Sequence, residues 1–389
     1  MIPYGCHKIE QDDIEAVVTA LKSGMLTCGD TVRQFEDTLS QVVQSRYAVS
    51  CCNGTAALHL SIMALGIGPG DHVIVPGITF LASANAVRYV GANIIFTDVD
   101  PDTGLMTYDT LQKVILENKD KRIKALVNVH MAGQCENLES IYNLAKEQGL
   151  FVIEDAAHAI GSIYVSSKGE EYPIGSNAFS DLTTFSFHPV KTIAMGEGGA
   201  ITTNSLELKT KLCLYRNHGM ERSQEKFDSQ NKNKPWFYEM QMLGYNFRAS
   251  DIHCALGMSQ LKKLDIFKQK RKEIVNAYEQ SFSGLEYLTP IRKLSSCDSA
   301  WHLYIVLIDY EHIGISREEL MRRLLSQGIG TQVHYIPVYS QPYYKELYGS
   351  QELPGCEHYY NRCLSIPLFV SLSKPMQENV VQEILNYVS

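Results

Sequence analysis

The chain has 389 residues, of which 45% are hydrophobic and 20% are charged, and its formal net charge is −8. This is the balance of an ordinary globular protein, and the length suggests two domains or one large domain with an appendage. The acidic balance argues against a nucleic-acid-binding protein, which would carry a basic face, and against an electrostatic membrane anchor.

The ten cysteines are scattered, and no two of them have C-x-x-C spacing. Neither a zinc site nor a redox pair is therefore indicated, and no metal site is expected. The start, MIPYGCHKIEQDD, is polar and acidic, unlike a signal peptide. No apolar run approaches the ~18 residues that a membrane span requires. We expect a soluble cytoplasmic protein with reduced thiols that contacts neither nucleic acid nor membrane.

From about residue 46 the chain alternates short apolar segments with helical ones. The apolar segments are rich in Val, Ile and Phe, as strands covered on both faces are. This alternation predicts an α/β fold around a mostly parallel sheet. The expected strands are Tyr47–Cys51, His72–Val75, Ile94–Asp98, Ala125–His130, Phe151–Glu154, Thr183–Phe187 and Ala200–Thr203, and the expected helices are Ala56–Leu65, Ala82–Val90, Tyr108–Glu117 and Leu138–Gln148.

The pattern changes after about residue 205. Residues 221–235 are polar and are expected to form an exposed loop. A long helix is expected over about Ala249–Gln280, broken or bent near Leu264. We therefore expect a large α/β domain over residues 1–263 and a small C-terminal α+β domain over residues 264–389. Its expected elements are the strands Leu303–Ile308 and Gly330–Val333 and the helix Arg317–Gln327.

The first candidate motif is NGTAALHL, which follows a strand and opens a helix. Gly54 lets the backbone approach a ligand closely, and Thr55 offers a hydroxyl group where free N–H groups and the helix dipole favour an anion. Taken alone, the motif is more often an ordinary helix cap with a turn glycine. It matches neither the P-loop nor the G-x-G-x-x-G pattern.

The second motif is FVIEDAAHAIGS, in which a buried strand delivers Glu154 and Asp155 at its C-terminal end. Open α/β sheets place ligands at that end. An acid there can pair with a buried cation or with a ring nitrogen whose proton must be held, and His158 follows three residues later. The alternative is a helix-capping aspartate with a core histidine.

The third motif is SFHPVK, which places Ser186 and Lys191 on either side of a turn set by Pro189. A lysine in a confined site can form a Schiff base with a carbonyl compound, and burial favours the unprotonated amine that this requires. Considered singly, any lysine is more often a surface residue.

The three motifs together indicate one cofactor. Pyridoxal 5'-phosphate (PLP) needs an anion site for its phosphate, a carboxylate for its ring nitrogen and a lysine for its aldehyde. The chain offers these in the order Gly54–Thr55, then an aromatic residue that could stack on the ring, Phe80, then Asp155 and Lys191.

These motifs belong to a wider resemblance. The chain resembles the fold-type I, PLP-dependent sugar-nucleotide aminotransferases of the DegT/DnrJ/StrS family over nearly its whole length, from GMLTCGDTVRQFE to CLSIPLF. The motifs that carry it are NGTAALHL, EDAAHAIGS, SFHPVKTIAMGEGGAITTN, RNHGM, GYNFRASDIHCALGMSQL and GIGTQVHYIPVYSQPYY. The resemblance implies a fold-type I PLP-dependent transferase with a smaller C-terminal α+β domain.

The resemblance also implies roles for individual residues. Lys191 matches the lysine that holds PLP covalently and later moves the proton, and Asp155 matches the partner of the ring nitrogen. His158 matches the residue beside the ring hydroxyl group. Asn246 matches a residue that reaches the cofactor of a neighbouring subunit, which implies a homodimer with shared active sites. The remaining cofactor matches are Gly54, Thr55 and Ser186 at the phosphate and Phe80 on the ring.

The substrate side follows from the same resemblance. Within the family, the motifs are most similar to those of the members that use L-glutamate to aminate C4 of a UDP-4-keto-6-deoxy-N-acetylhexosamine on the way to pseudaminic acid. Enzymes for bacillosamine, perosamine and aminoarabinose share the core motifs. Ala56 departs from relatives that have a second hydroxyl residue there. The positions that match the sugar-nucleotide pocket are Tyr4, Gly24, Met25, Leu26, Thr27, Gln332, Val333, His334 and Tyr335.

Three alternatives stand beside this hypothesis. A PLP-dependent sugar dehydratase of the same fold would have histidine in place of Lys191. A non-catalytic regulator that keeps the fold would not need Lys191, Asp155 and Ser186 together. A plain nucleotide-binding module would need one of the glycine fingerprints, which the chain lacks.

Overall fold

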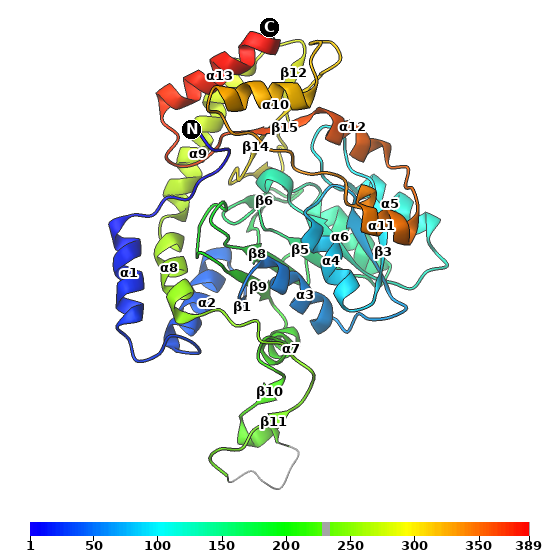
Figure 1. The fold of residues 1–389 in the computed structure, drawn as a ribbon. Helices are drawn as coiled ribbons and strands as arrows, with labels where there is room; N and C mark the ends of the chain where they lie inside the picture. Colours follow the sequence, from blue (N-terminus) through cyan, green and yellow to red (C-terminus); the bar gives the residue numbers. More distant parts are fainter. Residues whose placement is uncertain (228–233, 389) are drawn as a thin grey trace.

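The computed structural model describes residues 1–227 and 234–388, with a seven-stranded sheet at its centre (Figure 1). The strand order is β1-β9-β8-β5-β4-β2-β3; β9 runs antiparallel to both neighbours, and the other pairs are parallel. The expected α/β class with a mostly parallel sheet is therefore confirmed. The strands are β1 (Tyr47–Cys51), β2 (His72–Pro76), β3 (Asn93–Thr97), β4 (Ile123–Val129), β5 (Phe151–Asp155), β8 (Leu182–Ser186) and β9 (Gly199–Thr203).

Helices cover both faces of this sheet, because successive side chains of its strands alternate between two buried sides. Val73 and Val75 of β2 join the core on the side of α4, whereas Ile74 between them packs with α5 and α6. One face carries α3 (Gly54–Ala64), α4 (Leu81–Tyr89) and α7 (Leu206–Arg216); the other carries α2 (Asp30–Val43), α5 (Tyr108–Glu117), α6 (Leu138–Glu147) and α8 (Asp251–Leu261), with α1 (Gln11–Leu21) packed along α8.

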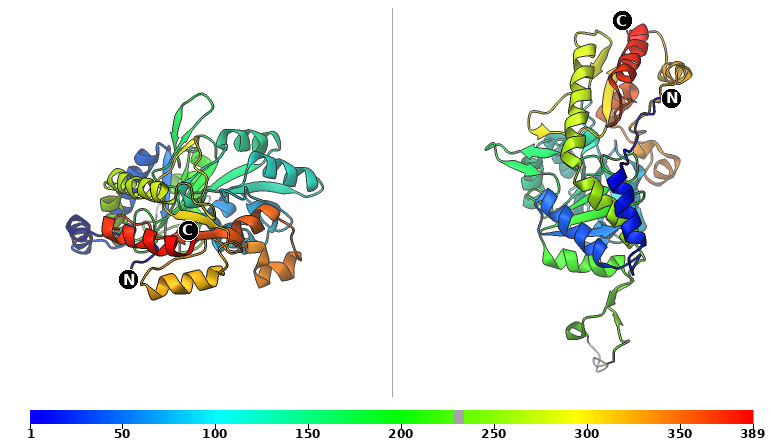
Figure 2. Two further views of the ribbon diagram at one scale, coloured as in Figure 1. Left: turned by 90° about the horizontal axis from the view of Figure 1, so that it is seen from above. Right: turned by 90° about the vertical axis from the view of Figure 1, so that its left-hand side faces the viewer.

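The C-terminal part of the chain builds a second, antiparallel sheet in the order β12-β14-β15. The start of the chain joins it: Ile2 pairs with Ile329, and Leu368 N donates to Tyr4 O at 3.0 Å. Both termini lie at this end of the molecule (Figure 1, Figure 2). The elements are α9 (Leu264–Phe282), β12 (Leu288–Pro290), β14 (Tyr304–Ile308), α10 (Arg317–Ser326), η3 (Val338–Ser340), α11 (Pro342–Tyr348), α12 (Pro354–Arg362), β15 (Cys363–Ile366) and α13 (Lys374–Val388).

Short elements complete the fold. The strands β6 (Ile163–Val165), β7 (Glu171–Pro173) and β13 (Cys297–Asp298) form a small sheet, and η1 (Met131–Gly133) follows β4. The strands β10 (Met220–Glu221) and β11 (Glu239–Met240) pair in an arm that projects beyond α7 (Figure 1). In the part of the chain that the structure describes, no helix is both long and apolar enough to cross a membrane.

Two expectations for the second half can be compared with the structure. The expected helix of residues 249–280 exists as α8 and α9, which are separated at Lys262 and Lys263, so the break near Leu264 is confirmed. The expected strand Gly330–Val333 is wrong, because only Gln332 pairs, in a single bridge to Ser365. Of the expected loop 221–235, residues 228–233 lie outside the described residues, and the rest includes η2 (Gln224–Lys226). The division at residue 263 stays a prediction.

Candidate active site

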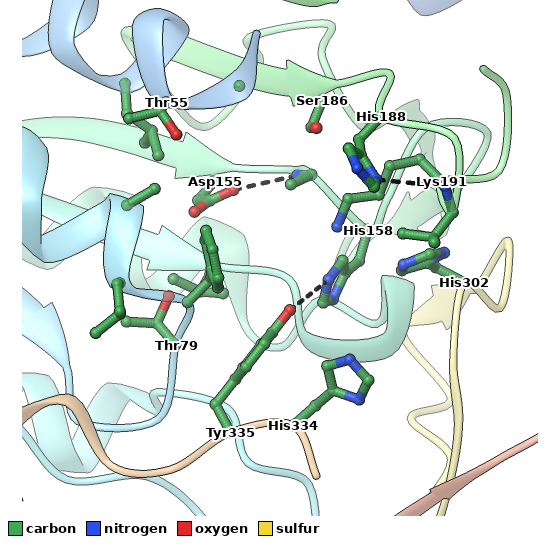
Figure 3. A pocket seen from close by; sticks show the side chains of 18 of the residues that line it. Thr55, Thr79, Asp155, His158, Ser186, His188, Lys191, His302, His334 and Tyr335 are labelled. Atoms are coloured by element: carbon green, nitrogen blue, oxygen red, sulfur yellow. Dashed lines mark hydrogen bonds between the residues drawn. The ribbon is translucent and has the colours of Figure 1, made fainter. Parts of the chain in front are cut away.

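A cavity of about 620 Å³ lies at the carboxyl ends of β5 and β8, between the central sheet and the C-terminal part. Figure 3 shows side chains from both parts of the chain pointing into it. It brings together most of the residues that the sequence nominated. Those that line it are Tyr4, Gly54, Thr55, Phe80, Asp155, His158, Ser186, Lys191, Gln332, Val333, His334 and Tyr335.

Lys191 lies on the turn that follows β8, where its backbone N–H donates to the carbonyl oxygen of His188 at 2.8 Å. Its side chain reaches into the cavity, and its Nζ atom has no hydrogen bond or ion pair with any described residue. Burial lowers the pKa of Lys191 to about 8, although the charge of Asp155 opposes this shift. About a tenth of the amine is therefore unprotonated at pH 7, far more than for an ordinary lysine, and this is the form that attacks a carbonyl group.

Asp155 is the last residue of β5, and two donors orient its carboxylate. Ser83 Oγ, from α4, donates to Oδ2 at 2.7 Å, and Ala157 N donates to Oδ1 at 3.2 Å. Ser83 Oγ also lies 2.7 Å from Thr79 Oγ1. The carboxylate is thus held in place at the edge of the cavity, where it can accept a hydrogen bond from a protonated ring nitrogen.

The neighbouring acid, Glu154, has a different environment. It is 3% exposed and faces the opposite side of the sheet, where His130 Nε2 lies 3.3 Å from its Oε1 atom. Thr183 and Ser180 donate to its other oxygen. Burial opposes ionisation of Glu154, but these hydrogen bonds outweigh it and lower the pKa of the carboxyl group. Glu154 is therefore a structural acid and does not line the cavity.

The start of α3 forms an anion site on the other side of the cavity. Asn53 caps the helix by accepting from Ala56 N at 2.8 Å, and the N–H groups of Gly54 and Thr55 find no acceptor among the described residues. A Cβ atom on Gly54 would lie 2.8 Å from Ser186 Cβ, so only glycine allows this close approach. The two free N–H groups at the helix N-terminus, together with the hydroxyl groups of Thr55 and of Ser186 at the end of β8, suit a phosphate.

A wall of histidines and a tyrosine closes the cavity beside Lys191. Tyr335 OH lies 3.0 Å from His158 Nε2, and the His158 and His302 rings are 4.5 Å apart. Burial, together with the charge of Lys191, lowers the pKa of both His158 and His302 well below the usual range and that of His334 to about 3. These imidazoles are therefore neutral at physiological pH and add no positive charge next to the lysine.

His302 was not among the residues that the sequence nominated. It is 4% exposed and lines the cavity. Arg271 of α9 donates to the carbonyl oxygens of Trp301 and His302, each at 3.2 Å, and Ala132 O accepts from His302 N at 3.2 Å. The sequence does contain a signal for it: His302 is the second residue of the otherwise apolar run WHLYIVLI. A polar side chain buried in such a run is expected to have a hydrogen-bonding or functional role.

Some nominated residues do not line this cavity. Asn246 is exposed and forms a bridge with Asn217 near the base of the arm. The segment Gly24–Thr27 is also exposed, and Thr27 pairs with Ser250 at the start of α8. Their expected contacts with a cofactor and a sugar nucleotide stay predictions.

The family model described as the DegT/DnrJ/EryC1/StrS aminotransferase family matches residues 7–385. The chain belongs to this family. It is therefore a PLP-dependent aminotransferase of the fold-type I architecture, as the resemblance implied.

Two curated relatives and one solved structure illustrate the similarity. The spore coat polysaccharide biosynthesis protein SpsC of Bacillus subtilis is 36% identical over 390 residues, which cover 100% of this chain and 97% of SpsC. The UDP-4-amino-4,6-dideoxy-N-acetyl-beta-L-altrosamine transaminase of Campylobacter jejuni is 39% identical over 367 residues, which cover 94% of this chain and 92% of the transaminase. Helicobacter pylori PseC, an aminotransferase of pseudoaminic acid biosynthesis, superimposes with a TM-score of 0.90 at 30% identity, covering 100% of this chain and 99% of PseC.

The residues of this DegT/DnrJ/EryC1/StrS family member fit PLP. The free N–H groups at Gly54 and Thr55 offer donors for a phosphate, and the carboxylate of Asp155 stands ready for the ring nitrogen. Lys191 Nζ is free to attack an aldehyde. When bound, PLP supplies that aldehyde and an electron-withdrawing ring that stabilises negative charge on the carbon that loses a proton.

Proposed function

We propose that the protein moves an amino group from L-glutamate to C4 of a UDP-4-keto-6-deoxy-N-acetylhexosamine, giving a UDP-4-amino sugar for pseudaminic acid biosynthesis. One observation carries the proposal: a chain with Lys191 free in its cavity is 39% identical, over 94% of its length, to a transaminase named for such a product. The similarity to PseC supports the same substrate class.

The proposed roles divide the cavity by chemistry. Lys191 is the covalent tether and then the group that moves the proton, and Asp155 holds the ring nitrogen. Phe80 is 54% exposed beside the cavity, so its face is available to pack on a planar ring. His158 lies on the side of the ring hydroxyl group. The phosphate binders are Gly54, Thr55 and Ser186.

The sugar nucleotide is proposed to bind along the side of the cavity that the C-terminal part contributes. Tyr4, Gln332 and His334 line that side, together with Val333 and Tyr335. Lys191 is the only lysine or arginine among the described residues that line the cavity, so polar groups must serve both glutamate and the sugar nucleotide in turn.

The proposed assembly is a cytoplasmic homodimer with shared active sites. The support is chemical: glutamate and the diphosphate of the sugar nucleotide are both anionic, whereas Lys191 is the only lysine or arginine among the described residues that line the cavity of one chain. Asn246, which is exposed and outside the cavity of its own chain, is proposed to reach the cofactor phosphate of the partner. Gly24, Met25, Leu26 and Thr27 are proposed to contact the sugar nucleotide.

A second candidate is the same reaction on another nucleotide 4-keto sugar. The specific observation in its favour is the 36% identity to SpsC over the entire chain, because SpsC is named for spore coat polysaccharide biosynthesis. Bacillosamine, perosamine and aminoarabinose precursors are the sugars to compare.

The experiment is a panel of UDP- and dTDP-4-keto sugars offered with glutamate, with each product identified by NMR. The proposal expects a 4-amino product from the UDP-4-keto-6-deoxy-N-acetylhexosamine and little from the others, and Lys191→Ala is the matched control for background chemistry. A strong preference for a different sugar would establish the second candidate. If the yellow colour of the protein bleaches with glutamate but no sugar of the panel is aminated, both candidate functions are overturned.

A further inference from the structure

Tyr335 and His158 join the two parts of the chain at the cavity. His158 follows β5 of the central sheet, whereas Tyr335 comes from the loop before η3, and Tyr335 OH lies 3.0 Å from His158 Nε2 (Figure 3). Their rings are nearly parallel, at 22°, with centroids 6.1 Å apart. On its other side Tyr335 meets the ring of Phe80 at 5.9 Å.

Both partners are held firmly. The residue before Tyr335, His334, is fixed through its ring by Ser365, with Nδ1 2.7 Å from Oγ, and through its carbonyl oxygen by Tyr359 OH at 3.0 Å. His158 is 5% exposed and packs against His302. The hydrogen bond is therefore a fixed feature of the cavity wall.

The direction of the hydrogen bond between Tyr335 and His158 follows from counting the groups that each arrangement leaves unpaired. His158 Nδ1 has no partner among the described residues, and His158 Nε2 is the only hydrogen-bond partner that the Tyr335 hydroxyl group has among them. If Tyr335 donates to Nε2, only Nδ1–H stays unpaired. If Nε2–H donates instead, both the hydroxyl hydrogen and the Nδ1 lone pair are left unpaired. Because unpaired buried polar groups are costly, the first arrangement is favoured.

The protonation states agree with this direction. Burial raises the pKa of the Tyr335 hydroxyl group, which keeps its hydrogen. Burial and the charge of Lys191 lower the pKa of His158, so its imidazole carries one hydrogen and not two.

We propose that Tyr335 is a positioning residue of the transamination: by donating its hydroxyl hydrogen to His158 Nε2, it fixes the neutral imidazole as the Nδ1–H tautomer beside Lys191. Tyr335 thus acts through His158, in addition to any contact with the sugar nucleotide. The inference rests on the aminotransferase assignment and is independent of which sugar is used.

The tautomer has a consequence for Lys191. With the Nε2 lone pair engaged by Tyr335, His158 has no site at which to take up a proton without breaking that bond. The groups that act on His158 are Tyr335, Lys191, His302, His334 and, more remotely, His130, and none of them is a carboxylate that would stabilise an imidazolium. Asp155, an acid of the same cavity, acts on Lys191 and Tyr335. Tyr335 therefore acts in the same direction as burial, and the two together keep a second positive charge away from the amine that must accept a proton.

The direct test is ¹⁵N NMR of the holoenzyme labelled in histidine, with the His158 signals identified by their loss in His158→Ala. In the wild-type protein we expect a protonated Nδ1 and an unprotonated Nε2. An Nε2–H tautomer or an imidazolium near neutral pH overturns the proposal, whether or not any variant folds. Because no substrate is present, this outcome is separate from the result of the sugar panel.

Tyr335→Phe provides the second test. We expect the His158 signals to shift towards a tautomer mixture, and the half-reaction with glutamate to slow by roughly three- to tenfold, the size of one neutral hydrogen bond. On a His158→Ala background the same change should have little further effect.

Tyr344→Phe is the matched control, because it removes a buried tyrosine hydroxyl group bonded to Asn85 Oδ1 at 2.6 Å, away from the cavity. It should leave the His158 signals and the rate of the half-reaction with glutamate unchanged. A Tyr335→Phe loss that persists on the His158→Ala background would show a merely structural role and contradict the proposal.

Discussion

The hydroxyl group of Ser83 donates to the carboxylate of Asp155, with 2.7 Å between Oγ and Oδ2. Both residues are buried, and Ser83 Oγ lies a further 2.7 Å from Thr79 Oγ1, so a chain of two hydroxyl groups on α4 and the loop before it supports the acid. The carboxylate at the end of β5 is oriented before any ligand arrives, which reduces the reorganisation that cofactor binding requires.

Ser83→Ala should weaken PLP binding by roughly ten- to a hundredfold, because a hydrogen bond to a charged acceptor contributes about 1.5–3 kcal/mol. Absorbance titration of the apoprotein with PLP measures the change. Ser61→Ala removes another buried serine hydroxyl, bonded to Ala57 O at 2.8 Å in α3, and serves as the control. Equal PLP affinity in the two variants would show that Ser83 does not support Asp155.

Gly54→Ala should impair PLP binding more than it impairs folding. The added methyl group would lie 2.8 Å from Ser186 Cβ, so either the start of α3 or the end of β8, which carries Ser186, must move. Overpacking of this kind costs about 1–3 kcal/mol, and the displacement falls on the anion site itself. Thermal unfolding of the apoprotein, compared with PLP affinity, separates the two effects. Unchanged affinity would contradict the phosphate role of this turn.

PLP capture by the apoprotein should depend on pH through Lys191. Burial lowers its pKa from 10.5 to about 8, so the capture rate should rise as the pH passes through about 8 and then level off. In the window between these values the unfolded chain holds a proton that the folded chain lacks, so this group also makes apoprotein stability rise with pH there. Stopped-flow absorbance measures the rate. A rate that is still climbing steeply towards pH 10.5 would contradict a buried amine.

Active-site sharing can be tested by subunit mixing. An Asn246→Ala variant and a Lys191→Ala variant should each have low activity. If the partner's Asn246 completes each site, hybrid dimers contain one site with both residues intact, and mixing after mild dissociation should restore part of the activity. Mixing the Lys191→Ala protein with itself is the control. Hybrids that form, as shown by tag-based purification, yet remain inactive would refute sharing.

The sequence predicted the framework of the site well, for a physical reason. Buried parallel strands are nearly continuous apolar runs, so β5 was visible as FVIED, and its end located Asp155 beside the cavity. Strand alternation also explains why Glu154 and Asp155, adjacent in sequence, lie on opposite faces. Glu154 bonds Thr183 behind the sheet, whereas Asp155 meets Ser83.

The residues that were missed come from long-range packing. Ser83 sits inside a helix, and nothing in LASANAVRY marks one serine as the partner of an acid 72 positions later. His302 depends on Arg271, which binds the carbonyl groups around it from α9. The strand expected at Gly330–Val333 does not form, because the segment makes only one β-bridge, at Gln332. Gly330 N donates to Ile2 O, so the start of the chain lies where a neighbouring strand would pair.

The central claim is that Lys191 is the residue that holds PLP. Reduction of the holoenzyme with borohydride fixes the cofactor covalently on its lysine, and peptide mass spectrometry then identifies that lysine. We expect the modification on the peptide that contains SFHPVK, at Lys191, and its absence from Lys191→Ala protein. Modification of a different lysine, or none at all in yellow protein, would contradict the account.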